Sequence, residues 1–130
     1  MPKSKVASAN GIDTPPISGQ PESGWWWGGE RDNGRGFFVE WQGSRAFIAG
    51  YMYDAQGNAT WYVADSPVAN SQTFTGSWLQ FANGQPMTGS YKAPTLANGN
   101  VAPVTIQFQG ADTALLTLPS GTLPLTRFRF

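Results

Sequence analysis

The sequence predicts an all-β protein built as an antiparallel meander of about eight or nine strands. Short runs rich in β-branched and aromatic residues follow one another at intervals close to the roughly 8–12 residues typical of all-β barrels and sandwiches. No window carries the apolar stripe of an amphipathic helix. Turn-forming Gly, Asn, Asp and Ser separate the runs. The economical closed form of such a meander is a small up-and-down β-barrel, and a two-sheet β-sandwich is the alternative.

Nine strands are expected, and their positions follow from period-two alternation and from the turn signals between them. They are expected at Gly24–Trp27, Gly36–Gln42, Arg45–Tyr53, Thr60–Asp65, Thr73–Phe81, Met87–Lys92, Val104–Gln109, Thr113–Pro119 and Thr122–Phe130. The segment Gln42–Arg45 fits a two-residue hairpin loop, and Asp54–Asn58 fits a type I turn followed by a left-handed Gly57. Three further turns are indicated by Asn83-Gly84, Asn98-Gly99 and Ser120-Gly121.

The folded part is expected to be a single β-barrel domain, residues 24–130, preceded by a flexible leader or linker, residues 1–23. The leader contains no aromatic residue and is broken by Pro15-Pro16 and Gly19. It lacks the apolar core of a secretory signal, and no stretch approaches the roughly 18 apolar residues of a membrane helix. Either the protein stays where it is made or the chain is the mature form of an exported protein, and a leader rich in Ser, Ala, Pro and Gly favours the second. We therefore expect an extracellular or periplasmic protein without membrane insertion.

The two hairpin turns fix a register that sorts the side chains of residues 36–65 onto two faces. In this register Trp41 lies opposite Ala46, and Tyr51 lies opposite Trp61. The face expected to form the core collects Phe37, Val39, Trp41, Ile48, Met52, Tyr62 and Ala64. The other face collects Phe38, Glu40, Phe47, Tyr51, Trp61, Val63 and Asp65. A sheet that is apolar on both faces must be covered there, or it must bind something.

Composition removes several chemistries. The 130 residues include 8 basic and 8 acidic side chains, no His and no Cys. Ser–His and Cys–His nucleophiles, zinc sites built on His or Cys, haem and iron–sulfur ligation are therefore excluded. Formal neutrality argues against a nucleic-acid partner, which requires clustered positive charge. We expect no cofactor and no metal, since Asp32-Asn33-Gly34 lacks the closing carboxylate of a calcium loop.

The segment Arg35–Trp41 nearly matches the RNA-recognition signature K/R-G-F/Y-G/A-F-V-x-F/Y, in which strand aromatics stack on bases. It lacks the small residue between the two aromatics, and the helices of that fold are absent from the pattern. A helix-free oligonucleotide-binding barrel would escape the second objection. The balanced charge still argues against nucleic acid.

Three consecutive tryptophans, Trp25, Trp26 and Trp27, are the most unusual feature. In a strand they point to alternating faces, and indole suits stacking on sugar faces or planar rings. The expected ligand-binding residues are Trp25, Trp26, Trp27, Phe38, Glu40, Phe47, Tyr51 and Trp61. In the alternative, Trp25 and Trp27 plug one end of the barrel and Trp26 lies half-buried under a loop.

Three function classes stay open. The leading hypothesis is a non-catalytic module that holds a neutral small molecule or a saccharide on these aromatic residues. The second is a small barrel enzyme, a cyclase, isomerase or lyase, in which Glu40 or Asp65 and Tyr51 move protons in an aromatic cavity. Pairing of Glu40 with Arg45, Arg127 or Arg129 would explain that carboxylate without catalysis. The third is a purely structural or adhesive domain whose aromatics form the core.

Three segments, Gly24–Trp27, Arg35–Glu40 and Tyr51–Val63, carry a resemblance to a known type of domain. They are similar to the G-W-W-W, S-G-R-G-F-F and Y-D-x-x-G-x-x-x-W-Y-V pattern of a β-domain of unassigned activity found in exported proteobacterial proteins. Such domains occur as repeats or appended to hydrolases. The match covers residues 23–66 strongly and the rest only through Leu123–Phe128. The resemblance implies export and a compact β-domain, and it carries no catalytic residues.

The chain departs from this pattern at Glu30–Gly36, where many members have an uninterrupted E-S-G-R-G. The predicted meander also resembles the barrels of avidins and lipocalins, whose mouths bind small ligands through Trp and polar side chains. This second likeness is one of fold alone, and it implies a ligand site at a barrel mouth.

Overall fold

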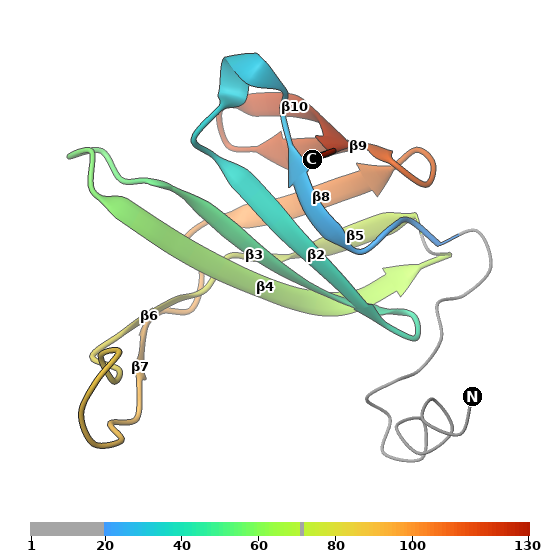
Figure 1. Ribbon diagram of the computed structural model, residues 1–130. Coiled ribbons are helices and arrows are strands. Elements are labelled where there is room, and N and C mark those ends of the chain that lie inside the picture. Colours follow the sequence, from blue (N-terminus) through green and yellow to red (C-terminus); the bar gives the residue numbers. More distant parts are fainter. Residues whose placement is uncertain (1–19, 71) are drawn as a thin grey trace.

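The chain folds into a closed antiparallel β-barrel of eight strands, which confirms the all-β barrel and excludes the sandwich (Figure 1). The computed structural model describes residues 20–70 and 72–130. Its strands are β1 (Gly24–Trp27), β2 (Gly36–Gln42), β3 (Arg45–Tyr53), β4 (Ala59–Ala69), β5 (Thr73–Ser77), β6 (Gln80–Ala82), β7 (Thr95–Asn98), β8 (Pro103–Phe108), β9 (Thr113–Leu118) and β10 (Gly121–Arg127). A short 3-10 helix, η1 (Glu30–Asp32), follows β1.

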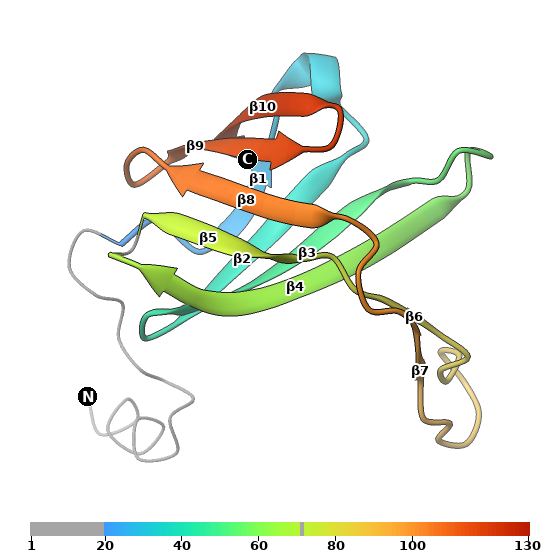
Figure 2. The same cartoon turned by 180° about the vertical axis from the view of Figure 1, so that it is seen from behind.

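The barrel follows the chain with one interruption. Its strand order is β1-β10-β9-β8-β5-β4-β3-β2. Barrel strands that follow one another in sequence therefore pair with one another, except that β5 pairs with β8 and β1 closes the barrel against β10. The intervening strands β6 and β7 pair with each other and form a separate two-stranded arm, residues 80–98. The arm projects from one end of the barrel in both views (Figures 1 and 2). The meander is therefore confirmed, with an inserted hairpin.

The predicted register of β2, β3 and β4 is confirmed. Trp41 pairs with Ala46 across the Gly43-Ser44 turn, and Tyr51 pairs with Trp61 across the next turn. Gly57 has a φ of 85°, the left-handed conformation that this turn requires. Because two turn geometries fix three strands, the two faces of this sheet are those expected from the sequence.

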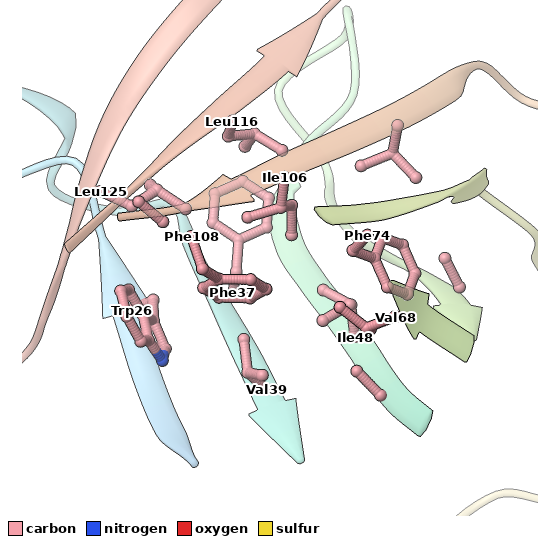
Figure 3. Packing of buried hydrophobic residues seen from close by; sticks show 14 of the residues in the cluster. Trp26, Phe37, Val39, Ile48, Val68, Phe74, Ile106, Phe108, Leu116 and Leu125 are labelled. Carbon is pink, nitrogen blue, oxygen red and sulfur yellow. The ribbon is translucent and has the colours of Figure 1, made fainter. Parts of the chain in front are cut away.

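The barrel interior is filled by side chains. The largest fully buried ones are Trp26, Phe37, Phe74, Ile48, Ile106, Leu116, Leu125, Val39 and Val104. Figure 3 shows many of them converging from strands on opposite sides of the barrel. Trp78 lies against this core with its ring centroid 6.1 Å from that of Phe37, and a Cβ atom on Gly50 would come within 3.2 Å of its ring. These side chains therefore occupy the interior of the barrel.

Two predicted strands differ in kind from the structure, and two more differ in length, since β4 continues to Ala69 and β10 ends at Arg127. Residues 87–92 form an exposed loop rather than a strand, because Gly89 has a φ of 119° and Pro86 precedes the segment. The return strand β7 lies further along, at Thr95–Asn98. The single strand expected over residues 73–81 is divided into β5 and β6 at Trp78, whose backbone N–H donates to the carbonyl of Ala102 at 2.9 Å.

The faces expected for the tryptophans in the plug alternative are inverted. Trp26 is fully buried in the core, where its ring meets that of Phe108 edge-on at 5.6 Å. Trp25 and Trp27 lie half-buried on the outside of the barrel. The Trp27 ring packs edge-on against Phe128 at 4.8 Å. Trp26 points inward because it is the cross-strand partner of Phe37, which is itself a core residue.

Residues 20–23, expected to belong to the flexible leader, lie against the barrel. The side-chain amide of Gln20 donates to the carbonyl of Gly43 at 2.7 Å, and the backbone N–H of Glu22 donates to the carbonyl of Ala111 at 2.9 Å. The indole N–H of Trp26 donates to the Glu22 carbonyl at 3.1 Å. These bonds place the start of the domain at or before Gln20. The leader assigned to residues 1–19 lies outside the described residues.

The Glu22 carboxylate forms ion pairs with Arg127 and Arg129, near the end of the chain. Nη1 of Arg129 lies 3.1 Å from Oε1 of Glu22. The hydrogen bond from Arg129, followed by the charges of Arg129 and Arg127, holds the pKa of Glu22 below its ordinary value of 4.5. A carboxyl whose folded-state pKa is lowered stabilises the fold above its unfolded pKa, and the contribution is lost as the pH falls.

Glu22→Gln is therefore expected to weaken the protein at neutral pH and to reduce its loss of stability on acidification from about pH 5 to about pH 3. Urea unfolding followed across this range measures both effects. Glu30→Gln, at an exposed carboxylate of η1, is the matched control and should keep the acid dependence of the wild type. An unchanged acid dependence in Glu22→Gln would contradict the role given to this carboxylate.

Candidate functional site

The outer face of β2, β3 and β4 carries an aromatic surface. Because alternate residues of a strand share a face, the cross-strand partners on this face form rows that run across the three strands. The rows are Gln42–Arg45–Pro67, Glu40–Phe47–Asp65, Phe38–Ala49–Val63 and Gly36–Tyr51–Trp61. Aromatic side chains therefore occupy the middle and one end of the surface, and charged ones occupy the other end.

Gly36 has no side chain, and the indole of Trp25 takes its place in the last row. A Cβ atom on Gly36 would lie 1.9 Å from Cζ2 of Trp25, so the ring rests directly on this glycine. The same ring is 5.5 Å from that of Tyr51. Tyr51 and Trp61, a cross-strand pair, are each 47% exposed. Trp25, Tyr51 and Trp61 thus form a continuous aromatic row, named here the aromatic row.

Two hollows lie on the outer surface, one next to the aromatic row and one at the charged end of the surface. The apolar hollow, about 360 Å³, is lined by Phe47, Trp61, Val63, Phe81, Ala82, Gly84 and Pro94. The polar hollow, about 300 Å³, is lined by Glu40, Gln42, Arg45, Ala46, Phe47 and Asp65. Phe47, which is 43% exposed, lines both hollows. The arm supplies one wall of the apolar hollow through Phe81 and Pro94.

The charged groups of the polar hollow are exposed. Nη2 of Arg45 lies 2.7 Å from Oδ1 of Asp65. Glu40 is exposed and has no ion-pair partner within residues 20–70 and 72–130. The hollow therefore presents one free carboxylate, one carboxylate shared with a guanidinium, and a side-chain amide from Gln42.

The pairing expected between Glu40 and an arginine is wrong. Arg45 binds Asp65, which lies diagonally across from it on β4, and Arg127 and Arg129 bind Glu22 at the other side of the barrel. Arg127 and Arg129 do not pair with Glu40 because residues 20–23 bring the carboxylate of Glu22 to them.

Of the eight expected binding residues, six share the outer surface: Trp25, Phe38, Glu40, Phe47, Tyr51 and Trp61. Trp26 is buried in the core, and Trp27 lies on the outside beside Phe128. The residues that sequence reasoning missed are Phe81 and Pro94 of the arm. Leu79 forms an isolated bridge with Val63, and this contact places Phe81 next to β4. No local sequence pattern indicates that Leu79 pairs with Val63.

The geometry gives the three candidate acid–base residues no common cavity. Asp65 is exposed and bound to Arg45, and Glu40 is exposed. Tyr51 lies four residues from Phe47 along β3, a separation of about 13 Å in an antiparallel strand. Proton transfer between Tyr51 and a carboxylate of the polar hollow would need contact over hydrogen-bond distance.

Comparison of the chain with protein-family models, curated proteins and solved structures found no match. Among the described residues, no helix is long and apolar enough to cross a membrane. The same part of the chain holds no group of three or more acidic, His or Cys side chains placed to bind a metal ion.

Proposed function

We propose that the protein is a non-catalytic binding module that holds a saccharide or a small planar molecule on the outer aromatic surface. The observation that carries the proposal is the aromatic row: Trp25, Tyr51 and Trp61 stand side by side on strands whose pairing fixes their positions. Exposed indole and phenol rings offer flat apolar faces with a polar tip. Such rings on a rigid sheet bind with little loss of side-chain entropy.

A saccharide suits this surface because it has an apolar C–H face and a rim of hydroxyl groups. The apolar face would stack on the rings, and the hydroxyl groups would donate to Glu40 and Asp65 and accept from Gln42. Export to the periplasm or the outside, the expectation from the leader, would bring the protein to glycans. The filled interior and the exposed carboxylates support this class over the enzyme class.

Trp61→Ala is expected to weaken saccharide binding at least about tenfold, because a large ring at the centre of a binding surface commonly contributes 2 kcal/mol or more. Titration with a panel of glycans, followed by tryptophan fluorescence and calorimetry, measures the change. Trp27→Ala is the matched control, since Trp27 is also a half-buried outer tryptophan but packs on Phe128 away from the surface.

Equal weakening by Trp27→Ala, or unchanged affinity in Trp61→Ala, would contradict the assigned site. If no glycan or planar dye binds the wild-type protein while both variants stay folded, the structural or adhesive reading replaces the binding module.

A further inference from the structure

The two hollows share one lining residue, Phe47, and are taken together as one binding surface, named here the groove. Their lining residues extend from Trp61 in the apolar hollow to Glu40 and Gln42 in the polar hollow. On β4 the groove runs from Trp61 to Asp65, four residues and about 13 Å of an antiparallel strand. A single pyranose ring covers only one aromatic side chain of such a groove.

The groove changes character along its length. At the Trp61 end the walls are apolar, with Val63 below and Phe81 and Pro94 of the arm beside it. Beyond Phe47 the walls carry two carboxylates, one guanidinium and one amide. An occupant of the whole groove must therefore offer flat apolar faces at one end and hydrogen-bond donors at the other.

Of the two strands beneath the groove, β3 is not free to bind a peptide backbone. It pairs with β2 over residues 45–51 and with β4 over residues 45–53, so its backbone groups are used within the sheet. A peptide that adds a strand needs an open sheet edge, and within the described residues the far edge of β4 pairs only at Val63, Val68 and Ala69.

A polyproline-type peptide offers mainly carbonyl acceptors, because proline lacks an N–H donor. The polar hollow has two side chains that could donate to them, Gln42 and Arg45, and Arg45 is already bound to Asp65. The carboxylates of Glu40 and Asp65 accept, and therefore favour hydroxyl groups.

We infer that the groove takes a linear oligosaccharide of several sugar units, which lies along β3 and β4 from Trp61 past Phe47 and donates hydroxyl groups to Glu40. This inference rests on the proposed function and names its substrate class: an extended, non-acidic glycan chain rather than a single sugar. An acidic glycan is disfavoured because the polar hollow already holds one carboxylate without an ion-pair partner among the described residues.

The test is a length series of cello-oligosaccharides and chito-oligosaccharides, from one to six units, titrated against the full chain by calorimetry. Affinity should rise with each unit until the chain spans the groove, by about tenfold or more from the monosaccharide to the longest chain. Phe47→Ala should remove most of this rise. Glu40→Gln should weaken only the longer chains.

The matched control is Tyr91→Ala, an exposed aromatic on the arm outside both hollows, which should keep the full length dependence. Equal affinity for all chain lengths would overturn the inference and leave the proposed function standing. No binding of any saccharide would overturn both. Binding of a ten-residue polyproline peptide that is lost in Phe47→Ala, without oligosaccharide binding, would show that the groove takes a peptide. Tighter binding of oligogalacturonate than of the neutral chains would overturn the charge argument.

Discussion

Trp26→Ala is expected to lower the free energy of unfolding by about 3–5 kcal/mol, the loss typical of a large aromatic removed from a core. Trp26 is fully buried, packs edge-on against Phe108 at 5.6 Å and donates to the Glu22 carbonyl at 3.1 Å. Alanine would leave a cavity and an unpaired carbonyl. Small domains have only about 5–15 kcal/mol of stability in total, so the variant should lie close to unfolding at room temperature. Urea unfolding followed by circular dichroism measures the loss.

The neighbouring tryptophans are the controls for this loss. Trp27→Ala should cost much less, because Trp27 is half-buried on the outside of the barrel. If Trp26→Ala cannot be purified folded, Trp26→Phe keeps most of the apolar volume, and its smaller loss can be measured. Similar losses for Trp26→Ala and Trp27→Ala would contradict the assignment of Trp26, rather than Trp27, to the core.

Gly36→Ala is expected to destabilise the protein by about 1–3 kcal/mol, although the change adds a single methyl group. The added carbon would lie 1.9 Å from Cζ2 of Trp25, so the indole has to leave its position beside Tyr51. Urea unfolding measures the loss, and the tryptophan emission should shift as Trp25 moves into water. Gly110→Ala is the control, since its nearest neighbour, Oγ1 of Thr113, would be at an ordinary 3.7 Å.

A double-mutant cycle decides whether the clash with Trp25 causes this loss. In a Trp25→Ala background the methyl group at position 36 meets no indole, so the double variant should be little less stable than Trp25→Ala. Additive losses would place the cost in the backbone of β2 instead. Full stability of Gly36→Ala, with unchanged emission, would contradict the packing of Trp25 on this glycine.

The sequence predicts best what a hairpin turn determines. The Gly43-Ser44 loop and the left-handed Gly57 set the pairing of β2, β3 and β4, and this pairing assigns Tyr51 and Trp61 to one outer face. Five of the six expected residues on the surface come from these three strands. Local turn geometry was therefore sufficient for most of the site.

The faces of β1 could not be determined in this way. A loop containing η1 joins Trp27 to Gly36, so no tight turn fixes the phase of the three tryptophans. The deciding fact is a gap in the neighbouring strand, where Gly36 leaves room for the ring of Trp25. A glycine such as Gly36 can belong to a turn or can leave room for an aromatic ring. Which of the two applies depends on a residue of a neighbouring strand, and the local sequence around the glycine does not identify that residue.

The other misses depend on contacts between residues far apart in the chain. Phe81 reaches the groove because Leu79 pairs with Val63, 16 residues earlier in the numbering. Residues 20–23 join the domain because Gln20 meets the β2–β3 turn and Glu22 meets Arg127 and Arg129. Composition alone assigned this segment to a leader, and composition carries no information about such partners.

The arm has a consequence for how this domain can diversify. Strands β5 and β8 pair directly across five residue pairs, so the barrel closes without any contribution from β6 and β7. Residues 83–100 are all exposed, and the side chain of Asn83 bonds within the arm to Thr95 at 3.1 Å. Mutations, insertions or deletions in this segment leave the core untouched, yet they reshape the groove wall at Pro94. The wall of the proposed binding surface can therefore be altered by exchanging one hairpin while the barrel stays constant.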